Sequence, residues 1–153
     1  MTNVDPAAGR RPSRLVTAIQ NAVTTIHVFV YRYSGGAIGG RAFKSPVLLL
    51  TTKGRKSGKR RTVPLLYLED GNRVVLVASN GGAAKHPTWW LNLEANPKAE
   101  IQIGRATHRV QAEQASAAEK RRLWPLLTAM YPPYQRYQDI TGRDIPVVML
   151  KRS

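Results

Sequence analysis

The chain has 153 residues, of which 42% are apolar, and a formal net charge of +15 at pH 7. That length suits one domain with a real hydrophobic core. Because the chain has no cysteine and only three scattered histidines, disulfides, a thiol nucleophile and a cysteine-ligated metal are excluded, and no metal site is expected. The charge points to an anionic partner: a nucleic acid, an acidic membrane surface or a polyanionic small molecule.

The N-terminal segment divides into a leader and a helix. Residues 1–12 are rich in Arg, Pro and Gly, and we expect a flexible basic leader there. Beyond Ser13, a good N-cap residue, apolar side chains recur every three or four positions, which predicts an amphipathic helix over residues 13–34. A glycine pair follows and is expected to end the helix.

This helix has two interpretations. Its uncharged stretch, Leu15 to Tyr31, is barely long enough to span a bilayer and contains several polar residues, so a transmembrane helix is not expected. The helix could pack on the domain, or it could lie on an acidic membrane surface with help from Arg10, Arg11 and Arg14. We expect a cytoplasmic protein and, on the second interpretation, one held peripherally at the inner face of the cell membrane.

A basic glycine loop follows the first expected strand. The apolar run from Pro46 to Thr52 suits a buried strand, and six of the nine residues 53–61 are cationic. Residues 41–61 together carry +8 of the net charge of +15. Glycines let this loop approach a ligand closely, and its amides, arginines and lysines can bind an anion. The alternative is a solvated hairpin tip whose charges only keep the protein soluble.

The middle of the chain predicts a hairpin and a short helix. Residues 62–68 and 73–78 are mainly apolar and flank Asp70-Gly71, a strong turn signal. Pro64 places its strand at an edge or a bulge. Residues 86–93 suit a short helix that carries two adjacent tryptophans. Because neighbouring helical side chains point about 100° apart, either both indoles are core residues or one of them lines a pocket.

The last third predicts three more strands, over residues 99–103, 106–112 and 145–150. Ser116 and Glu119 form a capping box that starts a helix, and Pro125 is expected to stop or kink it. Six short, mostly antiparallel strands with helices around them indicate a mainly β domain over residues 41–153, a barrel with peripheral helices.

Three tyrosines lie ahead of the last strand, spaced by three: Tyr131, Tyr134 and Tyr137. On a helix they would share one face. They form either a packing stripe or a phenol-rich wall over a flat ligand, with hydroxyls that can donate hydrogen bonds or protons.

The ordered combination of these motifs resembles the deazaflavin-dependent nitroreductase family, whose members use reduced 8-hydroxy-5-deazaflavin, coenzyme F(420). The matching residues are Leu48–Arg61, Pro64-Leu65, Asp70-Gly71, Ala78–Gly82, Lys85 to Pro87, Trp89–Leu93, Asn96-Pro97 and Met130–Pro132 with Tyr134 and Tyr137. The resemblance covers roughly residues 40 to 150.

What the resemblance implies is a six-stranded antiparallel split β-barrel with the cofactor in a groove. The cofactor carries a phosphate and a polyglutamate tail, so it is a polyanion of the kind that the charge calls for. The implied cofactor-binding residues are Thr52, Gly54, Arg55, Lys56, Ser57, Gly58, Arg60, Arg61, Pro64, Ala78, Ser79, Asn80, Gly81, Gly82, Lys85 and Trp89. Ser79, Trp89 and the three tyrosines match positions on the substrate side, where Ser79 or a tyrosine could donate a proton.

Two positions depart from the nitroimidazole-reducing type, in which Lys follows Ser79 and Tyr follows Leu65. Here these residues are Asn80 and Leu66. We expect cofactor binding to survive, whereas nitroimidazole turnover does not follow from the resemblance.

The expected activity is hydride transfer from the reduced deazaflavin to a flat electrophile such as a quinone, an enone or a nitroaromatic compound. The alternatives are an FMN-dependent oxidoreductase on the same barrel, a non-catalytic cofactor carrier and a basic barrel that binds RNA. The first interpretation requires no specific nucleic acid, and we expect a monomer or a weak homodimer.

Overall fold

The structure is a computed structural model, and it describes residues 14–37, 40–42 and 45–153. The expected leader over residues 1–12 and part of the glycine-rich connector therefore lie outside the described residues. The elements in chain order are α1 (Arg14–Ser34), β1 (Arg41–Ala42), β2 (Ser45–Lys53), β3 (Arg60–Leu66), β4 (Leu68–Asp70), β5 (Arg73–Val77), the short 3-10 turn η1 (Asn80–Gly82), α2 (Thr88–Ala95), β6 (Lys98–Ile103), β7 (Ala106–Gln114), α3 (Ala117–Met130), α4 (Pro133–Ile140) and β8 (Val147–Arg152).

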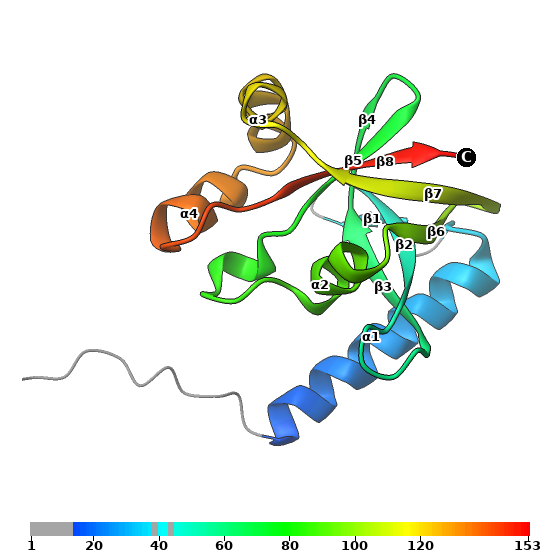
Figure 1. Cartoon of the computed structure of the whole chain (residues 1–153). Coiled ribbons are helices and arrows are strands. Elements are labelled where there is room, and N and C mark those ends of the chain that lie inside the picture. The colour runs from blue at the N-terminus through cyan, green and yellow to red at the C-terminus, as the bar shows by residue number, and fades with distance from the viewer. Residues whose placement is uncertain (1–13, 38–39, 43–44) are drawn as a thin grey trace, which may run out of the picture.

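One antiparallel sheet organises the molecule (Figure 1). Its strand order is β1-β2-β6-β7-β8-β5-β4, and β3 pairs with the other edge of β2. The strand expected over residues 62–68 divides at Tyr67, because β3 pairs with β2 whereas β4 pairs with β5. The chain thus passes from one end of the sheet to the other, and the sheet curls into a split barrel. The mainly β, antiparallel architecture is confirmed, with eight strands in the described residues rather than six because of this division and the two-residue β1.

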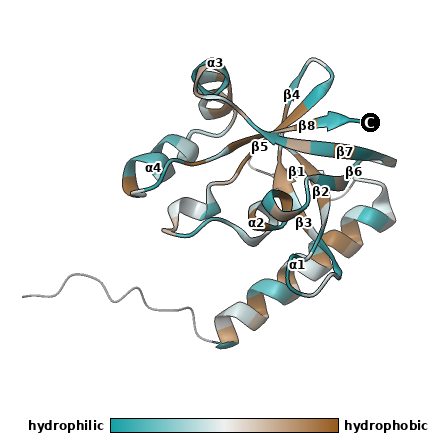
Figure 2. Cartoon of the chain, in the orientation of Figure 1, coloured by the Kyte–Doolittle hydropathy of each residue, from teal (hydrophilic) through white to brown (hydrophobic). Residues whose placement is uncertain are grey.

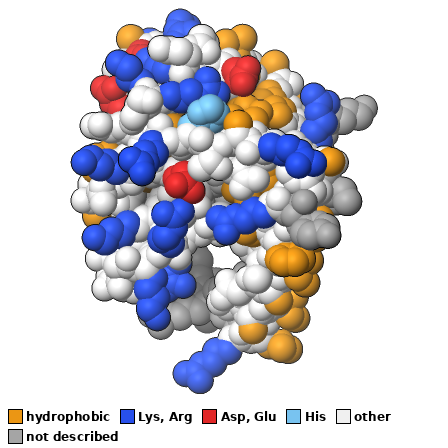
Figure 3. Space-filling model, turned by 90° about the vertical axis from the view of Figure 1, so that its right-hand side faces the viewer, with side chains coloured by type: hydrophobic (Ala, Val, Ile, Leu, Met, Phe, Trp, Pro, Cys, Tyr) orange, Lys and Arg blue, Asp and Glu red, His pale blue; other side chains and the backbone are white. Residues whose placement is uncertain are grey.

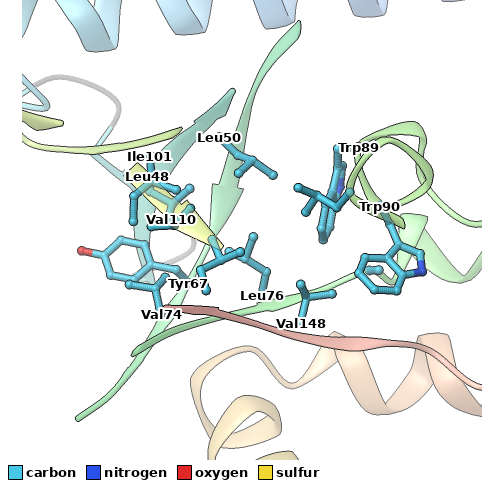
Figure 4. Packing of buried hydrophobic residues seen from close by; sticks show 13 residues of the cluster. Leu48, Leu50, Tyr67, Val74, Leu76, Trp89, Trp90, Ile101, Val110 and Val148 are labelled. Carbon is cyan, nitrogen blue, oxygen red and sulfur yellow. The ribbon is translucent and has the colours of Figure 1, made fainter. Parts of the chain in front are cut away.

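The strands β2, β5 and β8 each contain an uninterrupted apolar run, residues 46–50, 74–77 and 147–150, as expected for strands with both faces buried. Alternate side chains point to opposite sides, so Leu48, Leu50, Leu76 and Val148 meet inside the barrel with both tryptophans of α2 (Figure 4). The outward side chains of β5 and β8 pack under α3 and α4 in a second cluster that includes Val75, Val77, Met149, Leu123, Leu127 and Tyr134.

The helix α3 starts at the predicted capping box, where the Ser116 hydroxyl accepts a hydrogen bond from the Glu119 N–H at 3.2 Å. It continues through Pro125 to Met130, so the proline does not stop it. Leu123 and Leu127, on either side of Pro125, are fully buried. Their burial stabilises the helical path, and it offsets the loss of one backbone hydrogen bond at the proline.

The helix α1 is held at its C-terminal end. Tyr31, which is 1% exposed, packs on Val47 and Leu49 of β2. Its hydroxyl accepts from the Gly104 N–H at 2.9 Å and donates to the Gln102 carbonyl at 3.3 Å. The chain passes closely here, because a Cβ on Gly36 would lie 2.8 Å from the Gly104 Cα.

The helix α1 does contact the domain, through Tyr31 and the start of β3, but its apolar stripe faces solvent instead of the barrel. Five large apolar side chains are 55–69% exposed: Leu15, Ile19, Val23, Ile26 and Phe29. The ribbon of α1 alternates between brown and teal in Figure 2, and Figure 3 shows a band of hydrophobic side chains along one edge of the molecule. The rotation of α1 is set by Tyr31, so its opposite side is exposed. In the described part of the chain, no helix is long and apolar enough to cross a membrane.

Replacing one leucine inside the barrel and one on α1 tests this placement. Leu50→Ala should lower the free energy of unfolding by about 2–5 kcal/mol, because it leaves a cavity in a closed core. Leu15→Ala should change it by less than about 0.5 kcal/mol, since the side chain stays in solvent. Urea denaturation measures both, and equal losses would contradict the outward orientation of the stripe.

Candidate cofactor and substrate site

Two adjoining cavities lie where α1 crosses the barrel, and they share Thr24, Val63 and Trp89. The first, which we name the tyrosine cavity, has a volume of about 430 Å³ and is lined by Thr24, Val63, Pro64, Leu65, Leu66, Val77, Ser79, Asn80, Gly81, Pro87, Trp89, Tyr131, Tyr134 and Tyr137. The second, the arginine cavity, has about 550 Å³ and is lined by Asn21, Thr24, Thr25, Thr52, Arg60, Arg61, Thr62, Val63, Thr88, Trp89 and Asn92. Together they form a groove with an aromatic end and a cationic end.

The three predicted tyrosines form one wall of the tyrosine cavity. Tyr131 meets Tyr134 edge to face with ring centres 4.9 Å apart, and the hydroxyls of Tyr131 and Tyr137 lie 3.4 Å apart. The contact with Tyr137, together with burial, raises the pKa of Tyr131 to about 12. Burial raises the pKa of Tyr134 above its usual value. Both phenols are therefore protonated near neutral pH and can act as hydrogen-bond donors.

A second part of the lining comes from the loop between β5 and α2. Asn80 has a positive φ of 47°, and Gly81 and Gly82 follow with φ of 62° and 80°. Asn80 adopts this left-handed conformation more easily than most residues because its short amide bonds locally, and here it donates to the Lys85 carbonyl at 3.0 Å. The small-residue turn recognised in the sequence is thus a tightly bent cavity wall.

The tryptophans have different surroundings. Trp90, which is 5% exposed, belongs to the barrel core. Trp89 is 8% exposed and part of the same cluster, but it also lines both cavities. Trp89 therefore joins the core to the groove.

The cationic end of the groove is lined by Arg60 and Arg61, at the start of β3, and by Thr52 of β2. Asn92 of α2, which is 2% exposed, fixes this corner. Its amide donates to the Thr52 hydroxyl at 3.1 Å, and its carbonyl oxygen accepts from the Arg55 N–H at 3.1 Å. The buried amide thereby sets where the basic loop leaves the barrel.

The basic loop itself is a hydrogen-bonded turn, in which the Gly58 N–H donates to the Gly54 carbonyl at 2.8 Å. Gly54 is required for close approach, since a Cβ there would lie 2.7 Å from the Ser57 hydroxyl oxygen. Arg55, Lys56 and Ser57 are exposed at the tip and line neither cavity of the groove.

A third cavity of about 530 Å³ lies on the other side of the hairpin and shares Thr52 and Arg60 with the arginine cavity. Besides Arg60, three cationic residues line this cavity: Lys53, Lys98 and Arg109. Gly58 lines it as well. Figure 3 shows the prevalence of Lys and Arg on one face of the molecule. Glu100, the acidic residue that lines the third cavity, forms an ion pair with Arg60 at 3.0 Å.

The remaining predicted residues, Ala78, Gly82 and Lys85, line neither cavity of the groove. Ala78 is fully buried in the barrel core, Gly82 abuts α4, where a Cβ would lie 2.9 Å from Ile140, and Lys85 contributes its backbone carbonyl to the loop. In the described residues, no group of three or more His, Asp or Glu side chains could hold a metal ion.

Sequence reasoning missed two contributors to the groove. Asn21, Thr24 and Thr25 form an uncharged polar face on α1 that lies over it. Thr24 precedes Tyr31 by seven residues, so the two share a helix face, and this spacing was the available signal. Asn92 lies within the matching motif Trp89–Leu93, but its role was not predicted, because only the fold brings α2 to the base of the hairpin.

Comparison with known proteins identifies the family. The family model described as F(420)H(2)-dependent quinone reductase matches residues 23–152. A Mycobacterium tuberculosis protein that carries the same quinone reductase name is 45% identical over 114 residues, covering 73% of this chain and 96% of that protein. A second protein of that name and species is 40% identical over 131 residues, covering 83% and 88%.

Solved structures of similar sequence point to the same family. An F(420)-H(2)-dependent reductase shares 41% identity with a TM-score of 0.64, covering 69% of this chain and 94% of that one. A protein described as a domain-swapped dimer shares 35% identity with a TM-score of 0.66, covering 87% and 99%. The match over most of the chain, with the same split barrel, shows that the protein belongs to the F(420)H(2)-dependent quinone reductase family.

Proposed function

We propose that this protein reduces quinones with the reduced deazaflavin coenzyme F(420). The observation that carries the proposal is the groove, whose aromatic end and cationic end share Thr24, Val63 and Trp89. A molecule with a flat ring system at one end and anionic groups at the other fits both its shape and its charge. When bound, the reduced coenzyme supplies a hydride.

The residues divide into two roles. Arg60 and Arg61 would hold the phosphate through charged hydrogen bonds, and the other cations of the hairpin would attract the acidic tail. Pro64, Trp89 and the loop Ser79–Gly81 flank the ring, and they exclude water from it. Protein groups thus supply placement and charge.

The tyrosines form the substrate side of the tyrosine cavity. A quinone oxygen gains negative charge during reduction, and a neutral phenol stabilises it by donating a hydrogen bond. The proposed proton donors are Tyr131, Tyr134, Tyr137 and the hydroxyl of Ser79, a buried residue that lines the same cavity. Leu66, which replaces the tyrosine of the nitroimidazole-reducing type, lines this cavity too and makes it more apolar.

Binding of the cofactor tests the proposal directly. The purified protein should quench the fluorescence of oxidised F(420) with a Kd far lower than for flavin mononucleotide. Arg60→Ala with Arg61→Ala should weaken binding by at least about 30-fold, since two charged hydrogen bonds to phosphate are lost. The weakening should shrink at high salt.

Lys151→Ala is the matched control, because Lys151 is an exposed cation that lines neither cavity of the groove. It should leave the Kd nearly unchanged. Tight selective binding of flavin mononucleotide, or no binding of F(420) at low salt, would contradict the proposed cofactor.

The tyrosine pair predicts a pH dependence. The Tyr137 contact is the main cause that raises the pKa of Tyr131 to about 12, so Tyr137→Phe should lower that pKa toward its usual value of about 10. Nuclear magnetic resonance of ring-labelled tyrosine measures it. If Tyr131 donates the proton, the alkaline fall in turnover should move to lower pH in the same variant, because the donor form is lost as pH rises through its pKa.

Tyr67→Phe serves as the control, since Tyr67 belongs to the barrel core and not to the tyrosine cluster. It should change neither the pKa of Tyr131 nor the pH profile. An unaltered profile in Tyr137→Phe, despite the lowered pKa, would exclude Tyr131 as the proton donor.

We also propose that α1 rests on an acidic membrane surface. Its sequence contains no acid, its stripe of five apolar side chains is exposed, and the chain carries a net charge of +15. An amphipathic helix of this kind binds by burying its apolar face among lipid headgroups while cations attract anionic lipids. The opposite face of α1 lines the groove, so a lipid-dissolved quinone would meet the site beside the membrane.

Cosedimentation with vesicles tests this contact. The protein should bind vesicles rich in phosphatidylglycerol, and Ile19→Glu with Val23→Glu should reduce binding by at least about tenfold because it puts charges into the apolar face. Leu126→Glu, at a 50% exposed leucine of α3, should have little effect. Equal binding by all three proteins would refute a role for the stripe.

Analytical ultracentrifugation of the same samples addresses the expected monomer or weak homodimer. If the stripe instead binds a second copy, the Glu variants should dissociate a dimer without any difference in vesicle binding.

A further inference from the structure

Arg143 lies in the segment between α4 and β8, and it does not line either cavity of the groove. Its guanidinium donates to three backbone carbonyls of the loop that forms the wall of the tyrosine cavity. Nε reaches the Ala83 oxygen at 3.0 Å, Nη1 the Ala78 oxygen at 3.2 Å and Nη2 the Ser79 oxygen at 2.8 Å. One side chain therefore binds both ends of the bend.

A fourth contact joins Nη1 to the Nδ1 atom of His86 at 3.0 Å. A guanidinium has no acceptor, so Nδ1 of His86 must accept, and the ring proton sits on Nε2. The acceptors come from positions 78 to 86, and only a planar group with several donors can satisfy them together.

The charge of Arg143 is not used in an ion pair among the described residues, where Asp144 next to it pairs with Lys120 at 2.6 Å. Arg143 is half-buried, and burial lowers its pKa from the usual value. A guanidinium is costly to desolvate unless it is fully hydrogen-bonded, so the carbonyls of the loop compensate for its burial.

These contacts orient the backbone of the cavity wall. In a trans peptide the N–H points opposite to the C=O, and Ala78 and Ser79 both aim their carbonyls at Arg143. The N–H groups of Ser79 and Asn80 are therefore directed away from Arg143. Three consecutive left-handed residues follow, with Asn80 at φ 47°, a conformation that persists only when its surroundings hold it in place.

The segment that carries Arg143 also continues from the tyrosine wall. Gly82 packs against Ile140 and Tyr137 of α4, and Thr141 donates to the same Ala83 carbonyl at 3.4 Å. From the other side, Gln138 of α4 donates to the Arg143 carbonyl at 2.9 Å. Arg143 is thus tied both to α4 and to the loop that lines the cavity beside it.

We propose that Arg143 is a positioning residue that fixes the loop Ala78–His86 against the α4–β8 segment and so orients the part of the tyrosine cavity's lining that this loop supplies beside Tyr137. It acts through the loop backbone, without touching the ligands. The inference rests on the proposed function for its consequences in binding and turnover. Its structural part concerns the free protein and stands by itself.

The test uses Arg143→Ala, with Arg136→Ala as the matched control because Arg136 is an exposed arginine of α4. Hydrogen exchange of the cofactor-free protein should be faster by about tenfold or more at the amides of residues 79–86 in Arg143→Ala only. Addition of guanidinium ion at low, non-denaturing concentration should restore protection, whereas equal sodium chloride should not.

Binding and kinetics then test the link to the site. Arg143→Ala should weaken F(420) binding by about tenfold, because the loop that lines the site is less ordered. This loss of affinity is comparable to the loss of one charged hydrogen bond. It should lower kcat/KM for a soluble quinone by about 100-fold, as expected for misplaced walls. Guanidinium should rescue both. Arg143→Lys should be rescued less, since an ammonium keeps the charge but occupies the pocket with only one donor centre.

The outcomes are distinct. Unchanged exchange at residues 79–86, or faster exchange with unchanged binding and turnover, would overturn the positioning role. If wild-type protein fails to bind F(420), the proposed function fails, but exchange and its guanidinium rescue still decide whether Arg143 orders the loop. If Arg143→Ala does not fold, the same measurements on Arg143→Lys decide the question, because that variant retains the charge and most of the side-chain volume.

Discussion

Burial of both faces of β2 is the constraint on which the other parts of the molecule depend. Leu48 and Leu50 point into the barrel, where they meet α2 and β5. Val47 and Leu49 point outward and receive Tyr31 of α1. One uninterrupted apolar run therefore specifies a closed core and the docking point of a helix, because alternate residues of a strand serve opposite faces. At its end the strand meets the basic loop, so core and anion-binding corner share one element.

The same arrangement explains the unusual orientation of α1. Once Tyr31 is inserted beside β2 and hydrogen-bonded at the β6–β7 turn, the rotation of the helix is decided. Thr24 then faces the barrel, and the apolar stripe faces away from it. A helix whose polar side lines a groove and whose apolar side is exposed reverses the usual amphipathic arrangement, and the lipid surface proposed as its partner would cover the exposed side.

The walls of the groove are held by buried polar side chains at positions that do not themselves resemble a site. Asn92 connects Thr52 to the start of the basic loop, and Arg143 connects four acceptors of the opposite loop. In both cases one side chain bonds backbone groups, the Arg55 N–H for Asn92 and three carbonyls for Arg143, and also one side-chain atom. Such residues are hard to recognise in a sequence because many of their partners are backbone atoms, which every residue possesses.

The sequence by itself determined most of the strands, the limits of α1 and α2 to within a few residues, and the cationic and tyrosine segments, because these depend on local periodicity, turn chemistry and charge density. The ordered motifs indicated the family. Pro125 shows the limit of local rules: the burial of Leu123 and Leu127 overrides the local tendency to end the helix. Only the tertiary structure decided that α1 turns its apolar stripe outward, that Thr24 and Asn92 reach the groove, and that Arg55 and Lys56 stay at an exposed tip while Arg60 and Arg61 line a cavity. These outcomes depend on contacts between residues far apart in the chain, such as Tyr31 with Gly104 and Asn92 with Thr52, and local sequence carries no record of such partners.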